Sequence, residues 1–276
     1  MNIIKASIRN AVRRKWKFAL VVFLFGVGLA VLTNVYDVVG AAERMDAAFG
    51  GEEPPSDEQL GEVARSGAMI FLFGTLGLFF AFGSILFAFL LPGGMVANER
   101  ESTAIMLWAQ HPMPLSSFYM WRYLGVQAVA LAAMLVFGLV AAVSVLPGET
   151  ASATGVGNLV SACLEGVLAC AVSFAITAHG IRRAAFFGMV FYLASGVSSG
   201  VLPLAEQSTS AIAGLARGVL PFVLFPVSGI DDLTRGFASE AAWDWGATGM
   251  VLYHFAVWTA IAWLGLRRME RRPLKL

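Results

Sequence analysis

Charged residues are scarce in this chain. Only 13% of its 276 residues are Asp, Glu, Lys or Arg, 58% are hydrophobic, and the mean hydropathy is +0.74. A water-soluble domain carries roughly 25% charged residues. The scarcity of charge therefore excludes an ordinary soluble protein, and the net charge of +1 gives no general attraction to nucleic acid.

Other absences narrow the function. No Gly-Lys pair occurs, whereas the P-loop that cradles nucleotide phosphates needs Gly-Lys followed by Ser or Thr, so we expect no ATPase motor on this chain. The sequence has no nucleophile elbow, no paired catalytic carboxylates and no metal-ligand spacing, which disfavours an enzyme. The two cysteines, Cys163 and Cys170, are about 10 Å apart on a helix, too far for a disulfide.

Long apolar runs are what the chain has instead. About 20 apolar residues cross a ~30 Å hydrocarbon core. Basic residues before the first run are typical of a signal peptide, but this run is too long for a signal core, and we interpret it as a retained span. The predicted fold is an all-α membrane protein with six transmembrane helices, at 18–36, 68–91, 123–146, 156–178, 184–204 and 246–266.

The basic residues predict the orientation. With six spans and both termini in the cytoplasm, all but four of the 19 Lys and Arg residues lie on the cytoplasmic side, as the positive-inside rule requires. The exceptions are Arg44, Arg65, Arg217 and Arg235. The expected location is the cytoplasmic (inner) membrane.

A seventh apolar run, 214–230, is ambiguous because it contains Pro221 and Pro226. A full span here would place the basic C-terminal tail outside and break the charge pattern. We therefore expect the region 206–245 to be an outer segment that re-enters the membrane or lies along it before the last span.

Two further segments lie outside the predicted spans. Ile4, Ile8 and Val12 recur every four residues among Lys and Arg, so residues 1–17 are expected to form an amphipathic helix on the anionic inner leaflet. The acidic stretch 37–67 contains a Pro-Pro pair and is expected to be a solvated outer connector.

A charged segment, 96–110, interrupts the apolar runs between the second and third spans. A Gly-Gly pair ends the second span, Asn98 is the expected N-cap, and Glu101 follows three residues later as in a capping box. Pro112 ends the predicted helix. Because its acidic first turn is poorly suited to anionic lipid, the helix is expected to meet a protein partner.

The stretch VANERESTAIMLWAQHPMPLSSFYMWRYLG resembles the intracellular signature of ATP-binding-cassette (ABC) exporter permeases of the second type. The matching residues, in order, are Glu99, Glu101, Thr103, Leu107, Pro112 and Arg122. The stretch departs from the signature at Ser102, where Gly is usual, at Ser117, where Arg is common, and at Arg122, where Lys is common. The likeness in topology extends over nearly the whole chain.

This resemblance implies that 96–110 is a coupling helix, which docks into a cleft of a separate ATPase subunit. The implied ATPase-coupling residues are Glu99, Arg100, Glu101, Thr103, Ile105 and Trp108. Glu99 and Glu101 would meet basic residues of the ATPase, while Trp108 would fill an apolar notch. The resemblance further implies two ATPase copies that bind ATP and Mg²⁺, a second permease copy or a related permease, and no cofactor on this chain.

Three residues inside the predicted spans are candidates for a site. Glu165 is the only acidic residue well inside a span, so it lines a substrate path, pairs with a base from another span, or has a structural role. Gly196 and Gly200 form a small-xxx-small pair that permits close helix approach. The resemblance implies that this span takes part in a dimer interface.

The expected function is that of an exporter permease driven by a separate ATPase. The alternative is a mechanotransmission or assembly component that uses the ATPase stroke to act on an extracytoplasmic protein, bound by the outer regions 37–67 and 206–245. A lipid, a hydrophobic peptide and a drug-like molecule all remain open as the substrate.

Overall fold

The computed structural model describes residues 3–36, 40, 57–101, 113–145, 153–206, 211–238 and 244–271. Helices make up almost all of these residues, and no β-strand occurs among them. The helices are α1 (Ile3–Val35), α3 (Asp57–Leu90), α4 (Met95–Glu101), α6 (Leu115–Val145), α7 (Ala153–Ala178), α8 (Ala184–Glu206), α9 (Ala211–Val223), α10 (Val227–Ala238) and α11 (Trp245–Arg271).

Five of these helices, α1, α3, α6, α7 and α11, are long and apolar enough to cross a membrane. The expected all-α, multi-pass membrane protein is thereby confirmed. The expected span at 184–204 is helical and forms α8, but its described apolar stretch, Ala184–Gly196, is shorter than a span. The sixth crossing stays a prediction.

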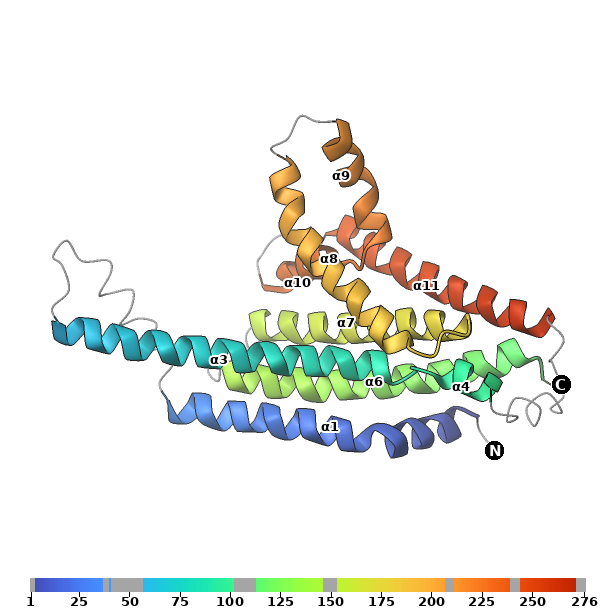
Figure 1. Ribbon diagram of the computed structural model, residues 1–276, viewed down its shortest axis with the longest axis horizontal. Helices are drawn as coiled ribbons and strands as arrows, with labels where there is room; N and C mark the ends of the chain where they lie inside the picture. The colour runs from blue at the N-terminus through green and yellow to red at the C-terminus, as the bar shows by residue number, and fades with distance from the viewer. Residues whose placement is uncertain are drawn as a thin grey trace.

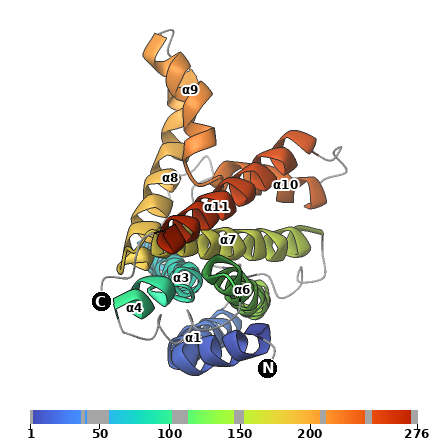
Figure 2. The same ribbon diagram turned by 90° about the vertical axis from the view of Figure 1, so that its right-hand side faces the viewer.

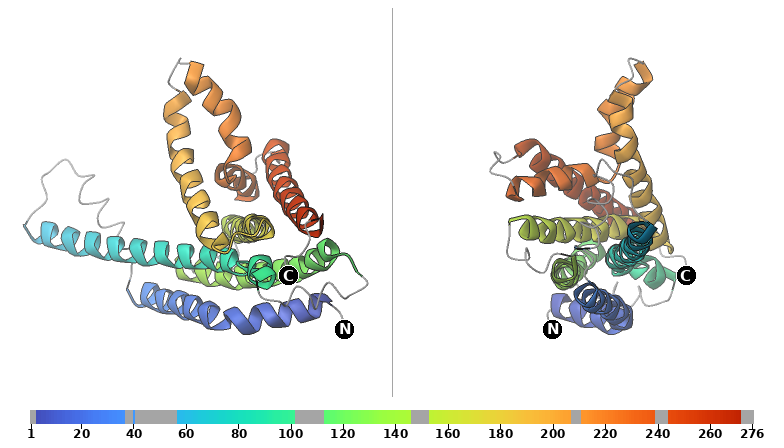
Figure 3. Two further views of the ribbon diagram at one scale, coloured as in Figure 1. Left: turned by 45° about the vertical axis from the view of Figure 1, so that its right-hand side comes forward. Right: turned by 90° about the vertical axis from the view of Figure 1, so that its left-hand side faces the viewer.

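The helices form layers around α7. In Figure 1, α1, α3 and α6 run alongside one another, while α8 and α9 project away from them. The end view in Figure 2 shows α7 across α3 and α6, with α10 and α11 on its other side. The oblique views in Figure 3 show the same projecting pair, α8 and α9, joined at their far ends.

The C-terminal half of α7 contains a stretch that is buried on every side. Every residue from Leu168 to Ala175 is at most 2% exposed, as expected for a helix surrounded by other helices. Small residues in this stretch let neighbouring helices approach closely, and the Ser173 hydroxyl donates to the Phe89 carbonyl of α3 at 2.6 Å. The predicted unpaired cysteines, Cys163 and Cys170, are confirmed as free thiols.

The predicted interfacial helix, 1–17, and the predicted span, 18–36, are not separated by a break in the helix, and the interfacial position of the first turns stays a prediction. Helix α1 is continuous from Ile3 to Val35, and its first turns pack along α6. The approach is close, because a Cβ at Gly125 would lie 2.9 Å from the Ile4 carbonyl oxygen. Since Ser7 is buried on this face while Val12 is 48% exposed, only part of the predicted apolar stripe is left for lipid.

The region 206–245 contains two helices, α9 and α10, separated by a break that ends at Pro226. Two side chains hold this break. The Phe225 amide donates to Ser195 Oγ of α8 at 2.8 Å, and His254 Nε2 of α11 donates to the Pro221 carbonyl at 2.8 Å. Helix α10 packs on α7 and α11. Re-entry of this region into a membrane stays a prediction.

The predicted outer connector, 37–67, is shorter than expected. Residues 57–67 form the first turns of α3, directly after the Pro-Pro-Ser stretch. Apart from residue 40, the remainder, 37–56, lies outside the described residues.

Candidate functional site

The chain turns sharply after α3. Residues 91–94 form this turn, in which the Met95 amide donates to the Pro92 carbonyl at 3.0 Å. Gly94 has a φ of 75°, a left-handed conformation that costs other residues free energy. Helix α3 thus ends at Leu90, just before the Gly-Gly pair, while the end of the second span at this pair stays a prediction.

Asn98 is not the N-cap of the following helix, contrary to expectation. Helix α4 begins at Met95, directly after the turn, and the Asn98 amide donates within the helix to the Gly94 carbonyl at 2.9 Å. The predicted capping box does not form because the left-handed Gly94 redirects the chain early enough for the helix to start four residues sooner.

Helix α4 is anchored on α7. Val96 and Ala97 are 0% and 1% exposed, and the Ala97 amide donates to Thr177 Oγ1 at 3.3 Å. This contact fixes the direction in which the remaining side chains of α4 point.

Glu99 points into the protein and binds two side chains of α6. Arg122 Nη1 lies 2.6 Å from Glu99 Oε2 and its Nη2 lies 2.8 Å from Oε1, so the ion pair is bidentate. The Tyr119 hydroxyl donates to the same Oε2 at 3.0 Å. The Arg122 and Glu99 side chains are only 8% and 16% exposed.

This pairing differs from the sequence-based hypothesis, in which Glu99 met a basic residue of the partner. Its charge is matched within the chain. One feature of the sequence could have indicated this pairing. Tyr119 and Arg122 are three residues apart near the start of α6 at Leu115, so they lie on one face of the helix. The guanidinium also lies 5.5 Å from the Phe118 ring centroid, a cation–π contact that further fixes its position.

Arg100, in contrast, is exposed. A Cβ at Gly180 would lie 3.2 Å from Arg100 Nη1, so the Arg100 side chain lies against the turn between α7 and α8. That turn exposes Ile181, Arg182 and Arg183. Arg100, Ile181, Arg182 and Arg183 together form what we call the basic end surface.

The structure says little about the other four implied coupling residues. Glu101 is the last residue of α4. Thr103, Ile105 and Trp108 lie outside the described residues, so their part in a coupling helix stays a prediction.

The end of α11 reaches the same end of the bundle. Glu270 Oε1 accepts a hydrogen bond from the Ser116 amide at 2.6 Å, in the first turn of α6. A carboxylate at a helix N-terminus satisfies an otherwise unpaired amide and complements the helix dipole. The start of α6 is therefore held by α4 through Glu99 and by α11 through Glu270.

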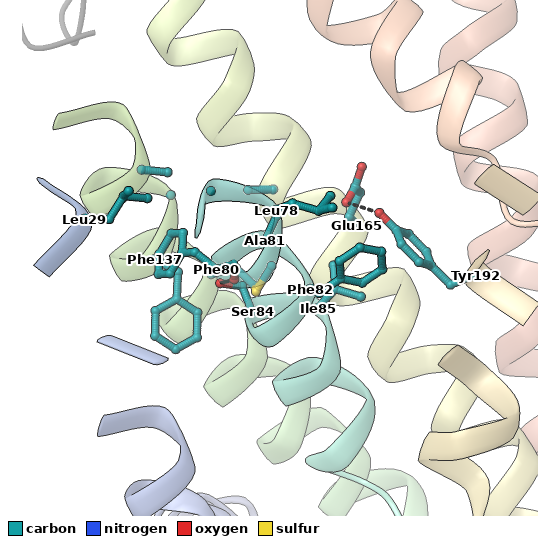
Figure 4. A pocket seen from close by; sticks show the side chains of 15 residues that line it. Leu29, Leu78, Phe80, Ala81, Phe82, Ser84, Ile85, Phe137, Glu165 and Tyr192 are labelled. Carbon is teal, nitrogen blue, oxygen red and sulfur yellow. Dashed lines mark hydrogen bonds between the residues drawn. The ribbon is translucent and has the colours of Figure 1, made fainter. Parts of the chain in front are cut away.

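A second feature is a partly open apolar cavity of about 400 Å³ between the helices, which we call the central cavity. It is lined by five helices, α1, α3, α6, α7 and α8. Figure 4 shows Glu165 and Tyr192 at one end and Leu29 and Phe137 at the other. Most of the lining is aliphatic or aromatic, which suits an apolar ligand with a single polar group.

The polar end of the central cavity joins α7 to α8. The Tyr192 hydroxyl donates to Glu165 Oε2 at 3.1 Å. Aromatic contacts fix the Tyr192 ring, whose centroid lies 5.1 Å from that of Phe225 and 6.3 Å from that of Phe89. Glu165 could be predicted from the sequence as a site residue, whereas Tyr192 could not, because nothing in the sequence shows that α8 packs on α7 at this point.

Of the small-xxx-small pair in α8, Gly196 has open surroundings within the chain, whereas Gly188, earlier on the same helix, packs closely on the Phe89 ring of α3. A Cβ at Gly196 would meet nothing within 4 Å, and Gly200 lies further along the same helix. Their place in a dimer interface stays a prediction.

Comparison of the chain with protein-family models, with curated proteins and with solved structures finds no match.

Proposed function

We propose that this chain is the permease subunit of an ABC transporter of the second type, an exporter driven by a separate ATPase subunit. The proposal rests on the resemblance of residues 96–125 to the coupling signature, and the structure adds one observation that carries it. The short helix α4 is joined to a membrane-spanning helix, α6, by the bidentate Glu99–Arg122 ion pair.

This ion pair gives Glu99 a mechanical role in place of a docking role. A force applied to α4 passes directly to the base of α6, because Arg122 is held by two hydrogen bonds and little water reaches it. Under this proposal Glu99 anchors the coupling segment to the membrane helices. Other side chains, which are exposed at the same end of the bundle, make the contact with the ATPase.

The basic end surface supplies those groups. Arg100 and the turn between α7 and α8 present positive charge beside exposed Ile181. We propose that this surface binds an acidic region of the ATPase, with charge setting the association rate and orientation.

The central cavity favours export over the mechanotransmission alternative. A cavity of about 400 Å³ with one carboxylate at its end suits a small lipophilic cargo, whereas a component that only transmits force needs no such space. We propose that Glu165 and Tyr192 contact the polar group of that cargo. Under this proposal two copies of the chain, or this chain and a related permease, form the core.

The test is purification of the tagged chain from its native membranes in mild detergent, followed by photolabelling with azido-ATP. We expect a labelled second polypeptide and ATP hydrolysis in the complex. Arg100→Glu should release this polypeptide, whereas Arg9→Glu, which reverses an exposed charge on α1, should retain it. A chain that purifies with no nucleotide-labelled partner, or equal retention in both variants, would contradict the proposal.

A further inference from the structure

A second, polar cavity lies at the end of the bundle that carries α4. Its volume is about 130 Å³, and it lies between the first half of α1, the turn at 91–94 with α4, and α6. We call it the basic cavity, and its charged and amide side chains are Arg14, Lys15, Arg122, Asn10 and Asn98.

The basic cavity has an excess of positive charge. Arg122 is neutralised by Glu99. Within the part of the chain that the structure describes, no carboxylate lies within ion-pair distance of Arg14 or Lys15. Two positive charges are therefore left unbalanced around a small space.

Hydrogen-bond donors are left over as well. In the described ranges, the side-chain amides of Asn10 and Asn98 have no hydrogen-bond partner. Together with the ammonium of Lys15 and the guanidinium of Arg14, they provide donors from α1 on one side and α4 on the other. This set of donors suits a ligand that has several acceptor oxygens and negative charge.

The turn of the chain determines the position of one of these amides. A Cβ at Gly94 would lie 2.6 Å from Asn98 Nδ2, so only glycine lets the amide lie over the turn. The size of the cavity also fits a phosphate group. A cavity of about 130 Å³ holds several water molecules, since one water needs only about 10–15 Å³ of such space, and a phosphate group with its four oxygens is of comparable size.

The surroundings indicate where the phosphate comes from. Trp16, beside Lys15, is 49% exposed, and Val12, one turn earlier, is 48% exposed on the same candidate span. Tryptophan among basic residues is typical of the headgroup level of a membrane. Basic pockets between membrane helices bind anionic headgroups.

We propose that the basic cavity binds the phosphate group of an anionic lipid headgroup. Arg14 and Lys15 supply the charge, and Asn10 and Asn98 bind the remaining oxygens. The bound headgroup bridges α1 and α4, so that lipid composition affects how firmly α4 is held. This inference does not depend on the proposed transport function.

The experiment uses the full chain in nanodiscs of phosphatidylcholine, with and without phosphatidylglycerol, and counts retained lipid by native mass spectrometry. The site variant is Arg14→Gln/Lys15→Gln. The matched control is Arg9→Gln/Arg13→Gln, which removes the same charge from exposed positions of the same helix that do not line the cavity. A charge-preserving variant, Arg14→Lys/Lys15→Arg, tests for an effect on folding.

We expect the site variant to lower the affinity for phosphatidylglycerol by about tenfold more than the control variant does. The site variant loses charge-assisted hydrogen bonds to the phosphate in addition to the general surface attraction, which is about a factor of five for each basic residue. The control should lose only the general surface attraction, and the charge-preserving variant should bind. Labelled inorganic phosphate, added to nanodiscs of phosphatidylcholine alone, forms the second arm. Binding of phosphate but not phosphatidylglycerol, lost only in the site variant, would assign the cavity to free phosphate, contradicting the lipid source. Equal losses in the site and control variants would overturn the inference altogether.

Discussion

Arg122, at the base of α6, binds both carboxylate oxygens of Glu99 on α4, at 2.6 and 2.8 Å. The pair is largely shielded from water, and Tyr119 adds a third hydrogen bond to the carboxylate. Among the described residues, few other contacts join α4 to α6, so the stability of this end of the bundle should depend on both charges.

Neutralising either partner should destabilise the chain strongly. Glu99→Gln or Arg122→Gln leaves one buried charge unpaired, which costs about 3 kcal/mol in the free energy of unfolding. The double variant should lose less than the sum of the two, by about 1–3 kcal/mol. Urea unfolding in detergent, followed by circular dichroism, measures these values, with exposed Arg9→Gln as the control. Additive losses would show that the two side chains do not interact.

In the turn after α3, Gly93 should tolerate substitution and the neighbouring Gly94 should not. Gly94→Ala should cost about 1–2 kcal/mol, because the residue has a φ of 75° and its Cβ would meet the Asn98 amide. Gly93→Ala should stay within about 0.5 kcal/mol, since its Cβ would have only contacts of 3.4 Å or more. Thermal unfolding of the two variants compares them directly, and an equal loss would disprove the left-handed turn.

Filling the central cavity should reduce the binding of lipophilic molecules without unfolding the chain. Gly77 lines this cavity, and a Cβ there would meet nothing within 4 Å, so the side chain of Gly77→Leu has room to enter it. Gly74→Leu is the matched control, because Gly74 has equally open surroundings on the same helix but does not line the cavity.

The measurement is displacement of a lipophilic fluorescent amine from the purified chain. We expect Gly77→Leu to weaken its binding by about 10-fold, since a filled cavity excludes part of the ligand's apolar surface. Unchanged binding in Gly77→Leu, or the same loss in Gly74→Leu, would place the ligand elsewhere.

The long apolar helices could be predicted because length and composition alone determine which segments can cross a bilayer. The pairing of Glu99 with Arg122 could not, because the residues are 23 positions apart and depend on how α4 docks against α7 through Ala97. The start of α4 was also predicted wrongly. The sequence around Asn98 has the pattern of a capping box, but the left-handed Gly94, four residues earlier, starts the helix before Asn98. Pro226 indicated a break before α10. The hydrogen bond that holds this break, from the Phe225 amide to Ser195, could not be predicted from the sequence.

The continuity of α1 has a mechanical consequence. A helix of 33 residues is about 50 Å long, well beyond the ~30 Å thickness of the hydrocarbon core. Its first turn is pressed against Gly125, and further along, a Cβ at Gly26 would lie 2.4 Å from the Phe80 ring. With two such tight contacts along one continuous helix, any tilt of α1 at its basic end would have to be accompanied by movement of α6 and α3.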